Sequence, residues 1–340
     1  MDMEYKEDEQ ISGLDTSIRP AQFSEFVGQK EVVSNLQIYL KAANIRSEPL
    51  DHILFSGPPG LGKTTLARII ASMQKGEFRQ VSAPNLKRTG DLVKILSGLE
   101  KNDTFFIDEI HRLVTPVEEV LYSAMEDNQV DITLSEGMGA MPIQLDIPPF
   151  TLVGATTRPG SLTAPLRDRF GIHLRLDYYN EDEIVDILKN AAVKWEIQCE
   201  HEAMIEIAKR SRKTPRIALR LLRRIWDYAI ADNNIHNAVI NLYIVKNGFE
   251  AMQIDHLGLT ALDNKMLQII AENFKGGPVG LKPLSAALSE DIITLEDFVE
   301  PYMVRLNLLH RTSRGRMLTK KGFQHINYAA PATTQKLFYE

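Results

Sequence analysis

The sequence predicts an α/β protein in three parts: a parallel-sheet domain, a helical domain and a smaller third domain. Over residues 18–179, short apolar runs alternate with helical patterns, which is typical of a parallel sheet with crossover helices. Within 180–252, apolar residues recur every three or four positions, which predicts helices. A break near "MQIDHLGLT" then separates a third block at 253–340.

Composition excludes several classes of protein. The 340 residues are 44% hydrophobic and 25% charged, which is ordinary for a globular protein. No run approaches the roughly 18 apolar residues of a membrane span. The single cysteine, Cys199, excludes an internal disulfide framework and favours a cytoplasmic location. Residues 1–17 begin with an acidic segment and are expected to form a disordered tail.

The elements of the first domain can be placed from local pattern. "HILFSG", "TFFIDE" and "FTLVGATT" are predicted strands, and a helix is expected at about 62–73. Two strand-like arms around a Gly-rich tip predict a β-hairpin at about 130–146.

Later elements are expected to be mainly helical. Helical spacing covers "EDEIVDILKNAAVKW", "EAMIEIAKRS" and "PRIALRLLRRIWDYAI". Near the end, "EPYMVRLNLLH" predicts a helix, followed by a turn at Gly315 and a strand over "RMLT".

A phosphate-binding loop is the strongest chemical signal. "GPPGLGKTT" matches G-x-x-x-x-G-K-[ST] at Gly57 to Thr64, between a predicted strand and a predicted helix. Backbone N–H groups and the helix N-terminus then surround phosphate oxygens. We expect Lys63 to reach the β- and γ-phosphates and the Thr64 hydroxyl to ligate Mg²⁺.

Two acids follow this loop by about 45 residues in "FFIDEIH". A strand that ends in Asp108 places its carboxylate beside the loop to hold Mg²⁺, directly or through water. Glu109 is the natural general base for an attacking water, so ATP hydrolysis is expected.

Further polar residues are expected around the nucleotide. Thr157 can orient the γ-phosphate or the water, or it can simply be a β-branched strand terminus. Arg167 and Arg169 flank Asp168, so they are either surface ion-pair partners or, for one of them, a group that stabilises transition-state charge. Arg216 begins a helix after Pro215 and can reach a phosphate, although its arginine stripe can also be a solvated face.

A second basic run lies in "HRTSRGRMLTKKG". By charge alone such a run is usually a solvated edge, and the other interpretation is a contact with nucleic acid.

Together, "GPPGLGKTT", "FIDEIHRL", "GATTR", "PLRDRFG" and "TPRIALRLLRR" resemble the AAA+ ATPases. Within these, phrases such as "EEVLYSAMED", "KGGPVGL" and "EDFVEPYM" resemble the bacterial Holliday-junction branch-migration motors, over about residues 18–325. The resemblance implies an AAA+ core at 18–179, a small helical lid at 180–252 and a winged-helix DNA-binding head at 253–340. It also implies a homohexamer on duplex DNA, a docking hairpin for the junction-binding protein RuvA, an association with RuvC, and roles in recombination, repair and the SOS response.

The resemblance also assigns residues. Arg169 corresponds to the finger that reaches a neighbouring subunit's γ-phosphate, and Arg216 to the sensor arginine of the lid. The resemblance places contacts with DNA on Arg311 and Arg316, and Arg314 of the same basic run is a further candidate. The remaining nucleotide-binding positions are Ile18, Arg19, Gly60, Gly62, Thr65, Glu126, Asp127, Asn128 and Tyr179.

Some positions depart from the family pattern. The hairpin has Met141 and Pro142 where an Arg-Ser pair is usual, and Gln144 where a basic residue is usual. Lys213 replaces a customary Gly beside the sensor arginine, and Ser313 replaces a Pro in the wing.

Three functional hypotheses follow. The first is an ATP-driven DNA motor of branch migration. The second is a nucleotide-dependent DNA-binding switch without processive work, which Glu109 and Arg169 argue against because a switch does not need fast hydrolysis. The third is a clamp-loader-like remodeller, which the predicted winged head disfavours. ATPase assays with and without junction DNA distinguish the first two.

Overall fold

The computed structural model describes residues 18–133, 142–233 and 238–329. The chain forms two compact units. The first consists of residues up to Glu196 together with Lys213–Leu219, and the second of Ile197–Arg212 and the residues from Arg220 onward. No helix in these described ranges is both long and apolar enough to cross a membrane.

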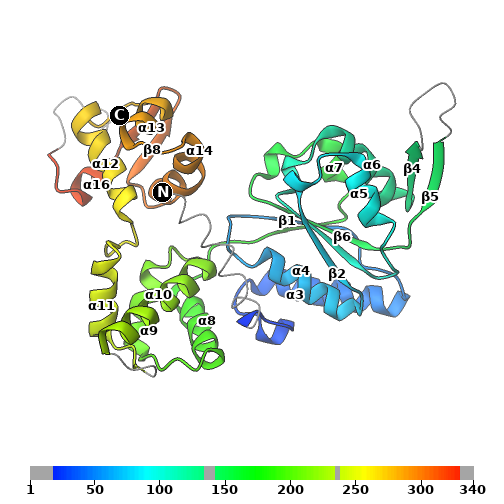
Figure 1. Ribbon diagram of the computed structural model, residues 1–340, viewed down its shortest axis with the longest axis horizontal. Coiled ribbons are helices and arrows are strands. Elements are labelled where there is room, and N and C mark those ends of the chain that lie inside the picture. Colours follow the sequence, from blue (N-terminus) through cyan, green and yellow to red (C-terminus); the bar gives the residue numbers. More distant parts are fainter. Residues whose placement is uncertain (1–17, 134–141, 234–237, 330–340) are drawn as a thin grey trace. The chain divides into compact units, whose positions relative to one another are not determined.

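A five-stranded parallel sheet organises the first unit (Figure 1). The strand order is β2-β3-β6-β1-β7, and the strands are β1 (Ile53–Ser56), β2 (Phe78–Ser82), β3 (Thr104–Asp108), β6 (Thr151–Thr156) and β7 (Ile172–Arg175). The three predicted strands, β1, β3 and β6, are confirmed and lie at the centre of the sheet. The edge strands β2 and β7 were not predicted from local pattern. Because the strands are parallel, their carboxyl ends meet at one edge of the sheet.

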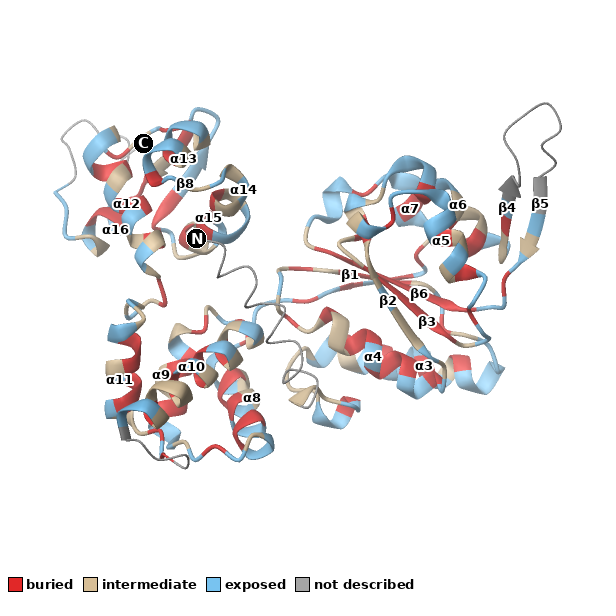
Figure 2. Ribbon diagram, in the orientation of Figure 1, coloured by how far each residue is buried: buried red, intermediate tan, exposed pale blue. Residues whose placement is uncertain are grey.

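Helices cover both faces of this sheet. Figure 1 shows α3 (Lys30–Arg46) and α4 (Lys63–Gln74) on one face, and α5 (Thr89–Leu96) and α6 (Thr115–Glu126) on the other. Alternate strand residues such as Phe105 and Ile107 join Leu92 of α5 and Leu121 of α6 in one core. The burial of strands and facing helix stripes is visible in Figure 2. This packing fixes the strand ends that carry the polar side chains.

Short elements complete the first unit. They are the 3₁₀ turns η1 (Phe23–Glu25), η2 (Ala83–Asn85), η3 (Ile110–Arg112) and η4 (Pro159–Ser161), and the helices α7 (Ala164–Asp168) and α8 (Glu181–Lys194). Asn180 caps α8 by accepting a hydrogen bond from the Glu183 N–H, which explains why the helix begins there.

The predicted hairpin is present. β4 (Gln129–Thr133) pairs antiparallel with β5 (Pro142–Asp146), with Asp131 opposite Gln144. Figure 1 shows this hairpin near α6 and away from the sheet. Its tip at 134–141, which includes Met141, lies outside the described residues.

The second unit contains the later helices and a small antiparallel hairpin. Its elements begin with α9 (His201–Arg210), the part of α10 (Pro215–Asn233) from Arg220 onward, and α11 (Leu242–Ala251). They continue with α12 (Ala261–Phe274), α13 (Leu281–Leu288), α14 (Ile292–Thr294), a π-helical turn η5 (Leu295–Val299), α15 (Glu300–Arg305), β8 (Leu309–Thr312), β9 (Gly315–Leu318) and α16 (Lys320–His325).

The C-terminal part has winged-helix architecture, and one local prediction there is wrong. The helix predicted over "EPYMVRLNLLH" ends at Arg305, because Asn307 has a left-handed φ of 57° and the chain then enters β8. In the β8–β9 hairpin Arg311 lies opposite Arg316. Arg316 also forms an isolated bridge with Val279, so the wing is tied to the loop before α13.

Candidate nucleotide site and DNA-binding arginines

The phosphate-binding loop lies between the carboxyl end of β1 and the start of α4. Its glycines Gly57, Gly60 and Gly62 have φ values of 138°, 77° and 101°, which side chains rarely tolerate. A Cβ on Gly60 would lie only 2.8 Å from Thr214 Cγ2 and 2.9 Å from Arg216 Cβ. Glycine therefore lets the start of α10 approach the loop, where the Arg216 N–H donates to the Gly60 carbonyl at 3.4 Å.

Lys63 is held by the loop itself. Its side chain is almost fully buried, and Nζ donates to the carbonyls of Gly57 and Pro58, each at 2.8 Å. Burial lowers the pKa of Lys63, and the nearby carboxylates of Glu109 and Asp108 oppose this shift. Thr64 and Thr65 follow in the first turn of α4 and are partly buried. The ammonium group is thus already at the loop, where a phosphate can replace the two carbonyls.

Asp108 and Glu109 lie at the end of β3. Burial raises the pKa of Asp108, and the charge of Glu109 adds to this effect. Asp108 Oδ1 accepts a hydrogen bond from the Glu109 N–H at 3.0 Å. Glu109 has a φ of 50°, an uncommon conformation for a side chain of this kind. Backbone conformations of this kind are found more often at functional sites than elsewhere.

Two neighbours contact the Glu109 carboxylate. The Thr157 hydroxyl donates to Oε2 at 3.0 Å, and His111 Nδ1 lies 3.2 Å from the same oxygen. β6 ends at Thr156, one residue earlier than the sequence suggested, so Thr157 is free to turn towards β3. His111 was not predicted, although its position two residues after Glu109 was a usable signal.

The donor set at this edge fits Mg²⁺. The Thr64 hydroxyl and the Asp108 carboxylate are oxygen ligands, which this ion prefers, and Mg²⁺ usually keeps several waters and phosphate oxygens besides one or two carboxylates. Within the described ranges, no group of three or more His, Cys, Asp or Glu side chains could form a full protein cage for a metal. The residues present therefore suit an ion shared with a nucleotide.

Tyr179 packs against the phosphate-binding loop. Its side chain is buried, and its hydroxyl donates to the Leu61 carbonyl at 3.0 Å, while its N–H donates to Lys213 O at 3.1 Å. Burial raises the pKa of this phenol.

The N-terminal positions lie against the same unit. The Ile18 carbonyl accepts from Lys194 Nζ at 3.5 Å. Arg19 is close enough to Arg68 of α4 to lower the pKa of Arg68, after the larger effect of burial.

A second group of predicted residues gathers at the end of α6 instead. Arg169, the C-cap of α7, pairs with Glu126, with Nε 3.1 Å from Oε1 and Nη2 3.1 Å from Oε2. Asp127 caps α6, and Asn128 O accepts from the Ile147 N–H at 2.7 Å. The described contacts of the Arg169 side chain are with Glu126, the Pro165 carbonyl and the Tyr122 ring. Arg167 pairs with Asp168 at 3.6 Å, as the surface interpretation expected.

The three arginines proposed for DNA differ in their surroundings. Arg316 donates from Nε and Nη2 to Glu300 Oε2 at 3.0 and 2.9 Å. Arg311 donates to the other oxygen of Glu300 and lies 3.5 Å from Glu296. Arg314 is exposed at the turn, and no ion-pair partner for it occurs among the described residues. Local sequence pattern does not indicate the Glu300 pairing, because this pairing joins α15 to both strands of the wing.

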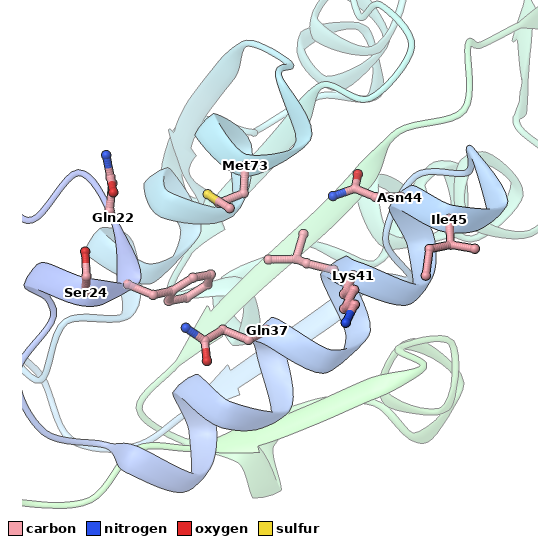
Figure 3. Close-up of a pocket in the computed structure, with 9 residues that line it drawn as sticks. Gln22, Ser24, Gln37, Lys41, Asn44, Ile45 and Met73 are labelled. Carbon is pink, nitrogen blue, oxygen red and sulfur yellow. The ribbon is translucent and has the colours of Figure 1, made fainter.

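A cavity of about 570 Å³ lies elsewhere in the first unit (Figure 3). It is bordered by η1, α3 and α4, and Figure 3 shows Lys41, Gln37 and Met73 around it. Its lining contains none of the predicted nucleotide-binding residues.

Comparisons with known proteins agree with this arrangement. A model described as the Holliday junction DNA helicase RuvB P-loop domain matches residues 18–176, the RuvB AAA lid model matches 179–255, and the RuvB C-terminal winged-helix model matches 256–327. A relative from Staphylococcus saprophyticus, described as a Holliday junction branch migration complex subunit RuvB, is 47% identical over 93% of this chain and 94% of its own.

Solved structures give the same result. The structure titled Thermotoga maritima RuvB Holliday junction branch migration motor has a TM-score of 0.83 and 46% identity, covering 93% of this chain and 100% of its own. A point mutant of that protein has a TM-score of 0.83 and 47% identity, covering 92% of this chain and 100% of its own. With a P-loop, lid and winged-helix model matched in order, the chain belongs to the RuvB family of AAA+ proteins.

Proposed function

We propose that the protein is an ATP-driven motor of Holliday-junction branch migration, which acts as a hexameric ring on duplex DNA together with RuvA. The carrying observation is the convergence of Lys63, Asp108 and Glu109 at one edge of the parallel sheet, with Arg216 against Gly60. These are the groups that ATP hydrolysis needs, in a chain whose family is that of the RuvB motors.

Each residue has a distinct role in hydrolysis. Lys63 moves from the carbonyls of Gly57 and Pro58 to the phosphates and neutralises their charge. Thr64 and Asp108 would hold Mg²⁺, which would supply further charge neutralisation to the phosphate oxygens. Glu109 accepts the proton of the attacking water, and Thr157 orients the Glu109 carboxylate through its hydrogen bond.

Arg169 does not act at the nucleotide site formed by the phosphate-binding loop of its own chain. Because its described contacts are with Glu126, Pro165 and Tyr122 and not with the phosphate-binding loop, we infer that it acts on the nucleotide of an adjacent subunit. An arginine supplied in trans is worth roughly 10³–10⁵ in rate for related hydrolases. Glu126, Asp127 and Asn128 belong to the same trans surface in this proposal.

The head and the hairpin supply the remaining contacts. Arg311, Arg314 and Arg316 bind DNA phosphates, which position a protein without reading sequence and so suit a motor that slides over any duplex. The β4–β5 hairpin docks on RuvA, and RuvC associates with the assembled complex. The cytoplasm is the expected compartment, since the single Cys199 suits a reducing environment.

Branch migration on a synthetic junction with the cognate RuvA tests this proposal. We expect ATP-dependent strand movement with the intact protein. In a hairpin variant, an Asn-Gly turn replaces residues 132–143. This variant keeps the Asp131–Gln144 pair and the part of the ladder from there to Gln129 and Asp146. It should retain ATPase activity and lose RuvA-dependent migration. Absence of strand movement with the intact protein contradicts the motor, whereas full migration by the hairpin variant contradicts only the docking role.

A further inference from the structure

The guanidinium of Arg169 is held on three sides. Its Cζ lies 4.5 Å from the centroid of the Tyr122 ring, Nη1 donates to the Pro165 carbonyl at 2.8 Å, and the Glu126 carboxylate pairs with it. The side chain of Glu126 is 54% exposed, so water and salt weaken its pull on the guanidinium. The attraction between the guanidinium and the Tyr122 ring involves no such exposed carboxylate.

Tyr122 is itself fixed by polar contacts. Its hydroxyl donates to Glu118 Oε2 at 3.0 Å, and the Thr163 hydroxyl donates to the same oxygen at 3.1 Å. Glu118 is only 3% exposed, so this carboxylate is a rigid anchor. Thr163 is also the N-cap of α7, the helix whose C-cap is Arg169.

The spacing on α6 explains why one helix can provide this support. Glu118, Tyr122 and Glu126 are each four residues apart and therefore lie on one face. On this face, Glu118 accepts a hydrogen bond from Thr163 at the start of α7. The Tyr122 ring stacks on the Arg169 guanidinium, and Glu126 pairs with its charge.

We propose that Tyr122 is a positioning residue for Arg169, whose ring presets the guanidinium plane before the side chain engages a phosphate. The inference rests on the proposed trans role of Arg169 and adds the residue that aligns it. Without the ring, the guanidinium samples other rotamers and meets the transferred phosphoryl group less often, since catalysis of this kind depends on positioning. In this proposal Tyr122 acts only through Arg169 and takes no direct part in the chemistry.

Steady-state ATPase kinetics provide the first test. Tyr122→Leu removes the aromatic face and should lower kcat by about tenfold with a smaller change in KM, whereas Tyr122→Phe keeps the ring and should stay within about threefold of wild type. Tyr39→Leu, the same substitution at an exposed tyrosine of α3, is the matched control and should leave kcat unchanged. If Tyr122→Leu folds poorly, Tyr122→Met provides a second variant without the ring. An unchanged kcat in the well-folded variant overturns the proposal.

Double mutants and mixed assemblies separate positioning from general structure. Tyr122→Leu should add no further loss in an Arg169→Ala background, because a residue that acts only through Arg169 has nothing left to align. Mixing the Tyr122→Leu and Lys63→Ala proteins should restore part of the activity. The intact phosphate-binding loop of a Tyr122→Leu subunit can then meet the correctly positioned Arg169 of a Lys63→Ala subunit. A further loss in the double mutant, or no restoration, overturns the role of Tyr122. Mixing Arg169→Ala with Lys63→Ala is the parallel control, and its failure contradicts the trans role of Arg169 itself.

Discussion

Arg316 donates from two nitrogens to one oxygen of Glu300, a side chain with no exposed surface. The other oxygen of Glu300 binds Arg311, which lies opposite Arg316 in the β8–β9 ladder. Two like charges directly opposite one another destabilise an antiparallel pair unless an opposite charge lies between them. Glu300 therefore makes it possible for the wing to carry both arginines.

Arg316→Ala should weaken DNA binding and reduce its dependence on salt. One phosphate fewer is neutralised, so the slope of log K against log salt should fall by about 0.9. Fluorescence anisotropy with duplex DNA at several salt concentrations measures this. Lys282→Ala removes the same charge from the exposed side of α13 and serves as the control. Equal slopes for Arg316→Ala and wild type would remove Arg316 from the DNA contact.

Glu300→Ala should loosen the wing. Removing one partner of a buried ion pair costs about 3–5 kcal/mol, because the remaining charges lose their compensation. The matched change Glu296→Ala, at a carboxylate that is 39% exposed, should cost under about 1 kcal/mol. Amide hydrogen exchange over 309–318 reports the effect, and equal protection in the two variants would show that Glu300 does not stabilise this hairpin.

Glu109→Gln should separate binding from hydrolysis. The amide keeps an oxygen for the Thr157 hydroxyl, so the loop should still bind ATP, while loss of the base lowers kcat by about 10²–10⁴. Nucleotide-binding titration and ATPase assays measure the two effects. Glu119→Gln makes the same change at an exposed position of α6 and should be silent. Loss of ATP binding in Glu109→Gln would instead indicate a structural role.

Asp108→Asn should stabilise the protein in the absence of nucleotide and Mg²⁺. Folding raises the pKa of Asp108, so at neutral pH the folded protein holds a charge that burial disfavours, whereas the unfolded chain holds it without this cost. The gain in the free energy of unfolding is on the order of 1 kcal/mol. It should be complete above the pKa of Asp108 in the folded protein and disappear below about pH 3.9, the pKa of an unfolded Asp. Urea unfolding at pH 7.5 and pH 5 measures it. A gain that grows as the pH falls would reverse the assigned sign.

Lys213→Gly should also increase stability. Lys213 has a φ of 58°, in the left-handed region where side chains cost about 1–2 kcal/mol and glycine costs none. After the greater flexibility of glycine in the unfolded chain is subtracted, the expected gain is about 0.5 kcal/mol. Lys213→Ala removes the same charge and keeps the strain, so its melting temperature should not rise. Equal melting temperatures for Lys213→Gly and Lys213→Ala would exclude backbone strain as the cause.

Prediction from the sequence succeeded where neighbouring residues decide the conformation. The glycines of the loop and the start of α4 are set within nine residues, and the central strands β1, β3 and β6 are short runs of apolar residues. It failed at Asn307, where a left-handed residue ends α15 early. The edge strands β2 and β7 were also missed, since neither is a continuous apolar run: β2 is at most partly buried, and β7 alternates buried and exposed residues.

The sequence by itself determined the chemistry expected at the candidate nucleotide site: which lysine, acids and hydroxyls stand at the ends of consecutive elements. Parallel strands bring such ends together whatever the details of packing, so motif and order suffice. Only the tertiary structure decided what supports these groups. Thr157 and His111 on Glu109, Tyr122 on Arg169 and Glu300 on Arg316 join elements that pattern alone cannot pair, because side-chain directions and helix faces are fixed only when the cores form.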